Sequence, residues 1–253
     1  MEQTKMLQVN KRCWDVVAPH FFQVDCLPKY GPYTASEDEI HLFDLIENTT
    51  VLDIGCGSGH SLEYMAERGA KELWGLDLSE TQIETANETL KDWKPKLICG
   101  AMEEELNIPE EHFDIVYSIY ALGWTSNLRK TLELIYSYVK PGGSFIFSWE
   151  HPVYSNLQYG TEEIVLCSSY HEETPITFET FKGEEVQATL YKRKMSTYIN
   201  ELNRAGFTIE RIEEPEPSCI FDGEVAEPST KYYSLYLSKA RMVPTTFIIK
   251  ARK

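Results

Sequence analysis

The feature that most constrains the fold is a short apolar run, Thr50 to Ile54, that passes directly into glycines at positions 55, 57 and 59. A strand that ends in closely spaced glycines and opens a helix brings backbone N–H groups close to a ligand, because no Cβ stands in the way. After this loop, helix and strand patterns alternate, at 60–68, 72–78, 79–90, 96–99, 113–119, 127–139 and 144–149. Such alternation requires βαβ crossovers and therefore predicts a parallel sheet.

The chain before the loop is rich in aromatic residues and is interrupted by prolines. Since exposed aromatic side chains are costly, we expect residues 1–35 to fold over the domain as a lid segment. Ser36 and Glu39 then have the spacing of a capping box, which predicts the start of a helix. The apolar face of that helix is expected to include Ile40, Phe43 and Ile46.

The C-terminal third changes in texture. Alternating apolar and polar residues at 177–181 and 186–191, on either side of a Lys-Gly-Glu turn, predict an antiparallel hairpin. We expect residues 153–195 to form a small cap inserted into a domain that spans 36–253. The fold is then Rossmann-like and doubly wound, an α/β domain with a mostly parallel seven-stranded sheet whose last strand is antiparallel. The last two strand candidates are 207–212 and 246–250.

Composition and charge exclude several classes of function. The net charge is −16, with 40 acidic against 24 basic side chains, which disfavours a nucleic-acid acceptor. A local basic patch at 192–194 is possible, but a solvated strand end is the more ordinary explanation. The six cysteines show no Cys-x-x-Cys pair, so no metal site is expected and reduced thiols in a cytoplasm are the default. No apolar stretch approaches the roughly 18 residues that a membrane span needs.

The glycine spacing and two acids indicate which cofactor the loop binds. Asp77 stands eighteen residues after Gly59, at the end of the next expected strand, where a carboxylate can accept hydrogen bonds from ribose hydroxyls. The pattern is Gly-x-Gly-x-Gly rather than the Gly-x-Gly-x-x-Gly of dinucleotide sites. Asp53, two residues before the first glycine, would repel a pyrophosphate but suits a ligand that carries an ammonium and a sulfonium. These residues favour S-adenosylmethionine over NAD.

The same residues resemble motifs of class I S-adenosylmethionine-dependent methyltransferases, most closely the bacterial small-molecule branch. The resemblance rests on the Asp53 to Gly59 run, on Asp77, on the strand at 113–116 and on the segment from Leu134 to Lys140-Pro-Gly-Gly. It is strong over roughly residues 45–150 and weaker in the C-terminal third. The motifs are specific when they are taken together, whereas a lone glycine loop would not be.

The resemblance implies how the cofactor is held. Asp53 and Gly55 would lie near its methionine part, Asp77 would bind the ribose, and the turn that begins at Ala101 would surround the adenine. Ala101 departs from the family, which often has Asp there. Cys56 fits the loop as a packing residue, and a plain helix-start role for His60 is as reasonable as a cofactor contact. The expected cofactor-binding residues are Asp53, Gly55, Cys56, Gly57, His60, Asp77, Leu78, Ala101, Met102, Glu103, Ser118 and Ile119.

The acceptor pocket is expected to be aromatic. Tyr120 and Trp124 follow the fourth strand, where this family lines its substrate entrance, and Trp14 and Tyr33 are candidates from the lid. Ordinary packing under a loop is the alternative for these side chains. His151 follows the fifth strand and is the best candidate for a general base, although a hydrogen-bonded structural histidine explains the position as well.

We therefore expect transfer of a methyl group from S-adenosylmethionine to a small-molecule acceptor, with catalysis mainly by alignment and desolvation. Two alternatives stay open at this point. One is a protein that binds S-adenosylmethionine without catalysis, and the other is an NAD-dependent oxidoreductase on the same fold class.

Overall fold

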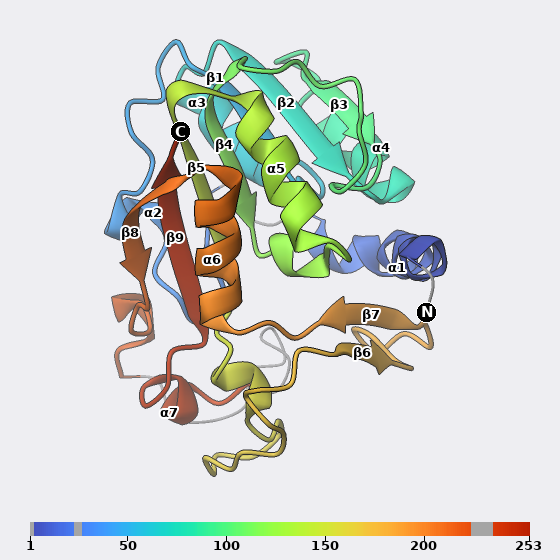
Figure 1. The fold of residues 1–253 in the computed structure, drawn as a ribbon, viewed down its shortest axis with the longest axis vertical. Coiled ribbons are helices and arrows are strands. Elements are labelled where there is room, and N and C mark those ends of the chain that lie inside the picture. Colours follow the sequence, from blue (N-terminus) through green and yellow to red (C-terminus); the bar gives the residue numbers. More distant parts are fainter. Residues whose placement is uncertain (1–2, 23–26, 224–234) are drawn as a thin grey trace.

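A computed structural model describes residues 3–22, 27–223 and 235–253. Its centre is a seven-stranded sheet of order β3-β2-β1-β4-β5-β9-β8, in which β9 runs antiparallel to both of its neighbours (Figure 1). The predicted Rossmann-like fold with an antiparallel last strand is thus confirmed. The strands of this sheet are β1 (Thr50–Ile54), β2 (Glu72–Asp77), β3 (Lys96–Cys99), β4 (Phe113–Ile119), β5 (Val139–Glu150), β8 (Thr208–Glu213) and β9 (Thr246–Arg252).

Helices cover both faces of the sheet, as Figure 1 shows for α5 and α6 on the near face. Alternate residues of each strand point toward that face, and Leu52 and Ile54 of β1 pack there in a core with Leu132 and Tyr198. On the opposite face Val51 packs with side chains of α3 and the end of α4. The helices are α3 (His60–Glu67), α4 (Glu80–Thr89), α5 (Leu128–Tyr138) and α6 (Met195–Ala205).

The caps predicted for these helices are present. Ser79 Oγ accepts the backbone N–H of Gln82 at the start of α4, and Asn127 Oδ1 accepts that of Lys130 at the start of α5. Such bonds satisfy N–H groups that a helix leaves unpaired, and each stabilises the helix by about 1 kcal/mol. At the other end of α6, Gly206 takes the left-handed conformation (φ +110°) that commonly ends a helix.

One helix is much shorter than expected. The Ser36–Glu39 capping box is present, but α2 (Glu37–Ile40) ends after one turn, with His41 at φ +53°. The cause is the buried Glu37 carboxylate, which accepts the backbone N–H groups of Leu42 and Phe43 and so takes the place of helical carbonyls. The expected helical face is therefore wrong beyond residue 40. Phe43 and Ile46 still pack against the core, from an irregular segment.

The N-terminal helix and the hairpin meet at the carboxyl edge of the sheet. Helix α1 (Gln3–Val17) lies beside the hairpin of β6 (Pro175–Phe178) and β7 (Ala188–Tyr191), as Figure 1 shows. Asn10 joins them, since its side chain donates to the carbonyl of Thr189 and accepts the N–H of the same residue.

The predicted antiparallel hairpin is present, but its strands pair over fewer residues than the predicted ranges 177–181 and 186–191. Phe181 and Glu184 form a separate turn, so residues 179–187 connect the strands rather than extend them. Phe181 packs against the ring of Trp14 in α1 instead. In the described part of the chain, no helix is long and apolar enough to span a membrane.

Candidate functional site

The glycine loop after β1 has the backbone geometry that its sequence predicts. Gly55, Gly57 and Gly59 all have positive φ, of +82°, +52° and +85°, a region that side chains disfavour. A Cβ on Gly55 would lie 2.3 Å from the Cβ of Ala121, which packs on the loop from the turn after β4. Around Gly57, by contrast, the nearest atom to such a Cβ is 3.9 Å away, on Gln82. The loop is therefore closed on one side and open at Gly57.

Asp77 fixes the position of this loop. It is the last residue of β2, and its Oδ2 accepts the N–H of Gly57 while its Oδ1 accepts the N–H of Ser79, both at 2.9 Å. Burial raises the pKa of its carboxyl, and the two N–H donors oppose that shift. The carboxylate predicted to bind the ribose thus stands between the glycine loop and the start of α4.

Asp53 lies fully inside the site. Its side chain is 2% exposed, and no group in the described residues hydrogen-bonds to its Oδ1. Burial and the charge of Asp77 raise the pKa of this carboxyl well above its usual value, while the Tyr117 hydroxyl offsets part of the shift. A buried carboxyl oxygen without a partner is unfavourable by ~1–3 kcal/mol and is stabilised most by a cation. These residues fit a cofactor that carries an ammonium group.

The residues predicted around the adenine lie next to Asp77. The N–H of Gly100 donates to the Asp77 carbonyl at 2.9 Å, which holds the following turn close to β2. Met102 packs against the core, and Leu78 is half-buried after β2. The N–H of Ala101 bonds to Glu104 at 3.3 Å.

Glu103 is the exception in this group. Its buried Oε1 accepts both the N–H and the hydroxyl of Ser126, at 3.0 and 2.6 Å, and so fastens the turn to the start of α5. This position gives the carboxylate an evident structural role. A contact from Glu103 to the adenine remains a prediction.

The remaining cofactor candidates support the floor of the site. Ser118 Oγ donates to the carbonyl of Ile54 at 2.8 Å and joins β4 to β1, and Ile119 packs against the core. Burial raises the pKa of the Cys56 thiol well above its usual value, as expected for a packing residue and unlike a nucleophile. His60 is the half-buried first residue of α3.

Three aromatic rings from three segments pack on one another beside the carboxyl edge of the sheet. Trp14 of α1, Trp124 of η2 (Leu122–Trp124) and Phe181 of the hairpin turn have ring centroids 5.2 to 5.7 Å apart. We call Trp14, Trp124 and Phe181 the aromatic roof. The ring centroid of Trp124 lies 6.2 Å from that of Trp149, and the centroid of Trp149 lies 5.2 Å from that of Tyr120. The sequence analysis named Trp14, Tyr120 and Trp124 as acceptor-pocket candidates but did not name Phe181. The position of Phe181 next to the predicted hairpin turn was the one sequence feature that could have pointed to it.

Tyr33 does not join this group. Its hydroxyl donates to the Leu235 carbonyl at 2.7 Å, and its ring packs on Phe221 at 5.1 Å in a separate apolar cluster. The backbone carbonyl of Tyr33 also accepts the N–H of Ser218. Tyr33 is thus placed to hold the C-terminal segment against the N-terminal one.

His151 has both ring nitrogens engaged. Its Nδ1 accepts the N–H of Val153 at 3.2 Å, so the ring carries its proton on Nε2, which donates to Glu214 at 2.8 Å. The side chain is also buried. In this arrangement the imidazole has no lone pair free to take a proton from an acceptor, and the structural interpretation is the favoured one.

Glu150, one residue earlier, was missed by the sequence analysis. It is the last residue of β5, and its carboxylate accepts a hydrogen bond from the hydroxyl of Tyr159. Burial raises the pKa of the Glu150 carboxyl. Its position at the end of the fifth strand could have identified it as a candidate, because side chains at the carboxyl ends of parallel strands line the ligand crevice of such sheets.

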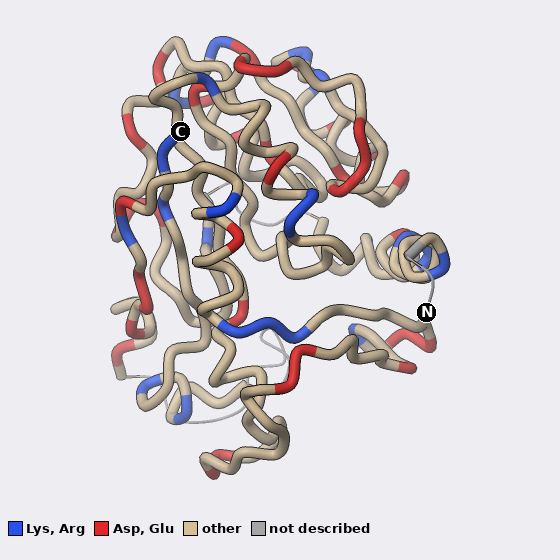
Figure 2. The backbone as a smooth tube through the Cα atoms, viewed as in Figure 1, with Lys and Arg blue, Asp and Glu red and all other residues tan. Residues whose placement is uncertain are grey.

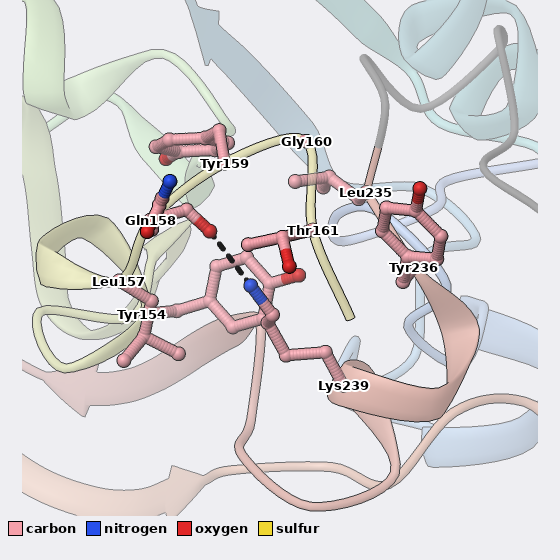
Figure 3. A pocket seen from close by; sticks show the side chains of 9 residues that line it. All are labelled: Tyr154, Leu157, Gln158, Tyr159, Gly160, Thr161, Leu235, Tyr236 and Lys239. Carbon is pink, nitrogen blue, oxygen red and sulfur yellow. Dashed lines mark hydrogen bonds between the residues drawn. The ribbon is translucent and has the colours of Figure 1, made fainter. Parts of the chain in front are cut away.

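A small hollow adjoins Tyr159. Its lining includes Tyr154, Tyr159 and the buried Lys239, and Lys239 Nζ donates to the carbonyl of Gln158 at 2.7 Å (Figure 3). Burial lowers the pKa of Lys239. The hollow lies where the loop after β5 meets α7 (Leu237–Ala240).

The basic side chains at 192–194 bond to other groups of the protein. Figure 2 shows them as a blue stretch between β7 and α6. Lys192 donates to Asn156 and Ser168, Arg193 to the carbonyls of Gly123 and Thr125, and Lys194 pairs with Glu173. These contacts favour the ordinary explanation over a nucleic-acid patch. The described residues contain no cluster of His, Cys, Asp or Glu that could hold a metal ion.

Comparison with known proteins finds a methyltransferase family over the part of the chain that contains the glycine loop. The family described as Methyltransferase domain (Methyltransf_11) matches residues 52–147, which run from β1 into β5. A protein of Haemophilus influenzae is 31% identical over 190 residues, which cover 70% of this chain and 74% of that one. The malonyl-[acyl-carrier protein] O-methyltransferase of Priestia megaterium is 33% identical, over 40% of this chain and 37% of its own length.

Solved structures extend the likeness over most of the chain. The crystal structure of an S-adenosylmethionine-dependent methyltransferase from Mesorhizobium loti has a TM-score of 0.71 and 26% sequence identity. The match covers 85% of this chain and 95% of that protein. The likeness therefore includes the segments on both sides of the region that the family pattern spans.

Proposed function

Because the chain belongs to the class I S-adenosylmethionine-dependent methyltransferases, we propose that it methylates a small molecule bound between its glycine loop and its aromatic roof. The enzyme class sets aside the NAD-dependent oxidoreductase and the protein that binds without catalysis. What remains to be proposed is the acceptor and the roles of individual residues.

The observation that carries the proposal is the aromatic roof itself. Trp14, Trp124 and Phe181 come from α1, η2 and the hairpin turn, and their rings contact one another over the carboxyl edge of the sheet. A folded macromolecule needs an open platform, whereas enclosed sites lined by aromatic side chains suit small ligands. The net charge of −16 is a further argument against a nucleic-acid acceptor.

The lid is fastened to the cofactor half by polar contacts. Asp15 of α1 accepts the hydroxyl of Ser79 at 2.7 Å, and Ser79 in turn donates its N–H to Asp77. Ser58 of the glycine loop donates its hydroxyl to the carbonyl of Phe21 at 3.1 Å. These bonds support a closed arrangement in which water is excluded from the reacting groups, which strengthens electrostatic interactions there.

In this proposal the cofactor supplies an electrophilic methyl group on a sulfonium, and the residues of the chain hold and align the reactants. Asp77 binds the ribose, Asp53 pairs with the ammonium group, and the open side of the loop at Gly57 admits the ligand. Alignment of this kind can contribute about 7–11 kcal/mol to catalysis, so a strong general base is not required. We accordingly assign His151 to the structure of the β5 end and not to proton transfer.

The test uses S-adenosylmethionine with a tritiated methyl group and a bacterial extract. After incubation, filtration separates small molecules from macromolecules, ion-exchange chromatography removes the unreacted S-adenosylmethionine from the small fraction, and the label that remains in each fraction is counted. The proposal expects enzyme-dependent label in the small fraction, with a Trp124→Ala variant giving much less. Label confined to the protein or nucleic-acid fraction would refute a small-molecule acceptor.

A further inference from the structure

The end of β5 holds a carboxylate that the proposed function does not yet use. Glu150 is the last residue of that strand and pairs in register with Thr246 of β9. The neighbouring strand, β4, ends one residue before Tyr120, and Ala121 packs on Gly55 of the glycine loop. Glu150 therefore lies at the same edge of the sheet as the cofactor loop, on the acceptor side of Tyr120.

The carboxylate of Glu150 is incompletely paired. It accepts a hydrogen bond from the Tyr159 hydroxyl, and in the described residues no other group donates to it. The charge of Lys192 lowers the pKa of this carboxyl, but its ammonium group donates its hydrogen bonds to Asn156 and Ser168, at 3.0 and 2.6 Å. A carboxylate has roughly four acceptor positions, so most of the capacity of Glu150 is unused.

Aromatic side chains surround this carboxylate. The Tyr159 hydroxyl donates to this carboxylate, and burial, with the charge of Glu150 as a second cause, raises the pKa values of the Tyr120, Tyr154 and Tyr159 hydroxyls. Tyr154 and Tyr159 line the hollow in Figure 3, and Tyr120 packs on Trp149 at 5.2 Å. Tyr159 is 49% exposed although its hydroxyl is bound, so its ring presents accessible surface beside Glu150.

A carboxylate among tyrosine rings is the chemistry that recognises a cation. The ring faces attract a cationic nitrogen when water is excluded, and the carboxylate adds direct charge pairing. An anionic ligand would be repelled by the carboxylate and by the negative ring faces. A neutral hydroxyl would gain one hydrogen bond without either attraction.

We propose that Glu150 recognises the methyl acceptor and that the acceptor carries a cationic nitrogen, a protonated amine, held between Glu150 and the Tyr120 and Tyr159 rings. This inference rests on the proposed function, because it identifies the class of small molecule that the same site takes. Glu150 can also receive a proton from that nitrogen. The N–H bond breaks, its electron pair stays on nitrogen, and the proton goes to a carboxylate oxygen.

The substitution Glu150→Gln separates this role from a structural one. The glutamine side-chain carbonyl can still accept the hydrogen bond of Tyr159, so the local packing is kept while the negative charge is lost. Glu214→Gln is the matched control, since Glu214 is half-exposed and pairs with His151 rather than facing the acceptor side. Both variants lose one negative charge, so a general effect of net charge would appear in both.

The experiment measures calorimetric binding of benzylamine, benzyl alcohol and benzoate to protein saturated with S-adenosylhomocysteine. These probes share one aromatic frame and differ in charge. We expect affinity to fall from the amine to the alcohol to the carboxylate, with roughly tenfold between amine and alcohol. Glu150→Gln should remove that preference, while Glu214→Gln should keep it.

Equal affinity for the three probes, a preference for benzoate, no binding of benzylamine, or an unchanged preference in Glu150→Gln would each overturn the inference. Its failure is distinct from failure of the proposed function. The labelled-methyl experiment can place the label in small molecules even if Glu150 selects no amine. If the label enters macromolecules alone, the proposed function fails first.

Discussion

The two halves of the site are built in different ways. In the cofactor half, the position of each group is set by the backbone: three positive-φ glycines, and the N–H groups of Gly57 and Ser79 bound to Asp77. In the acceptor half, the positions are set by side chains from segments far apart in sequence, such as Trp14, Trp124 and Phe181.

This difference has a physical consequence. A backbone cradle tolerates few substitutions, because side chains disfavour the positive φ of its glycines and a Cβ at Gly55 would also clash with Ala121. A roof of packed rings can change its lining residues and keep its fold as long as the volume is conserved. One half can therefore be common to a family that shares a cofactor, while the other varies with the acceptor. The following substitutions test the contrast.

The largest effect is expected from Gly55→Ala. The new methyl group would lie 2.3 Å from the Cβ of Ala121 at a residue with φ +82°, so the loop must shift away from the cofactor. We expect affinity for S-adenosylhomocysteine, measured by calorimetry, to fall by about 100-fold or more, which corresponds to ~2.7 kcal/mol. Gly142→Ala is the control, since Gly142 has φ +80° and no atom within 4 Å of the new Cβ. Equal effects of the two variants would show that backbone strain alone is responsible.

Trp124→Ala should affect the acceptor half alone. Its ring contacts both Trp14 and Phe181, so its loss opens the aromatic roof to water. We expect kcat/KM for the acceptor to fall by roughly 30-fold, or ~2 kcal/mol of transition-state stabilisation. The calorimetric affinity for S-adenosylhomocysteine should change by less than about threefold. A large loss of cofactor affinity would contradict the division into two halves.

Asp53→Asn should weaken the cofactor site through charge. We expect about tenfold weaker binding of S-adenosylhomocysteine at neutral pH. Because burial raises the pKa of Asp53 in the free protein, affinity should rise with pH as this carboxyl ionises, above the ordinary range of an aspartate. The variant should lose most of that dependence, with Asp77 supplying the remainder.

The stability of the unligated protein should fall as pH rises, whereas its affinity for S-adenosylhomocysteine rises. A carboxyl whose pKa is higher in the folded state binds more protons there than in the unfolded chain, so its ionisation destabilises the fold as pH rises. At neutral pH, calorimetry should therefore give a higher melting temperature for unligated Asp53→Asn than for the unsubstituted protein. A lower melting temperature together with unchanged affinity would contradict the role of Asp53.

The smallest effect is expected from His151→Gln. Both ring nitrogens are engaged by Val153 and Glu214, so the side chain supports the β5 end. Loss of these bonds should destabilise the protein by ~1 kcal/mol, while kcat changes by less than about threefold. Thermal unfolding and steady-state rates measure the two effects. A fall in kcat of more than 100-fold in a folded variant would restore His151 as the general base.

The parts of the molecule that were predicted correctly depend on local sequence. The glycine loop, the caps at Ser79 and Asn127 and the alternating strands each follow from residues that are close together in the chain. Asp77 could be placed from its position at a strand end, because the carboxyl ends of neighbouring parallel strands meet. The family resemblance over roughly 45–150 covers the same region that the family pattern matches, 52–147.

The parts that were missed depend on contacts distant in sequence. Helix α2 stops at Ile40 because the Glu37 side chain turns back to bind Leu42 and Phe43, which a hydrophobic period does not reveal. Phe181 contacts Trp14 across more than 160 residues, and Glu150 gains its partner from an irregular loop. No pattern in the sequence ranks Glu150 above the neighbouring histidine, the residue type that most often acts as a general base.

Thermal unfolding with added ligands tests the central claim most directly, namely that the glycine loop with Asp53 and Asp77 forms an S-adenosylmethionine site. A ligand at about 100 times its dissociation constant stabilises the fold by ~2.7 kcal/mol, which raises Tm by roughly 5–10 °C for a chain of this size. The account predicts such a shift with S-adenosylmethionine and with S-adenosylhomocysteine, and none with NADH at the same concentration. A shift with NADH and none with the two adenosyl compounds would contradict it.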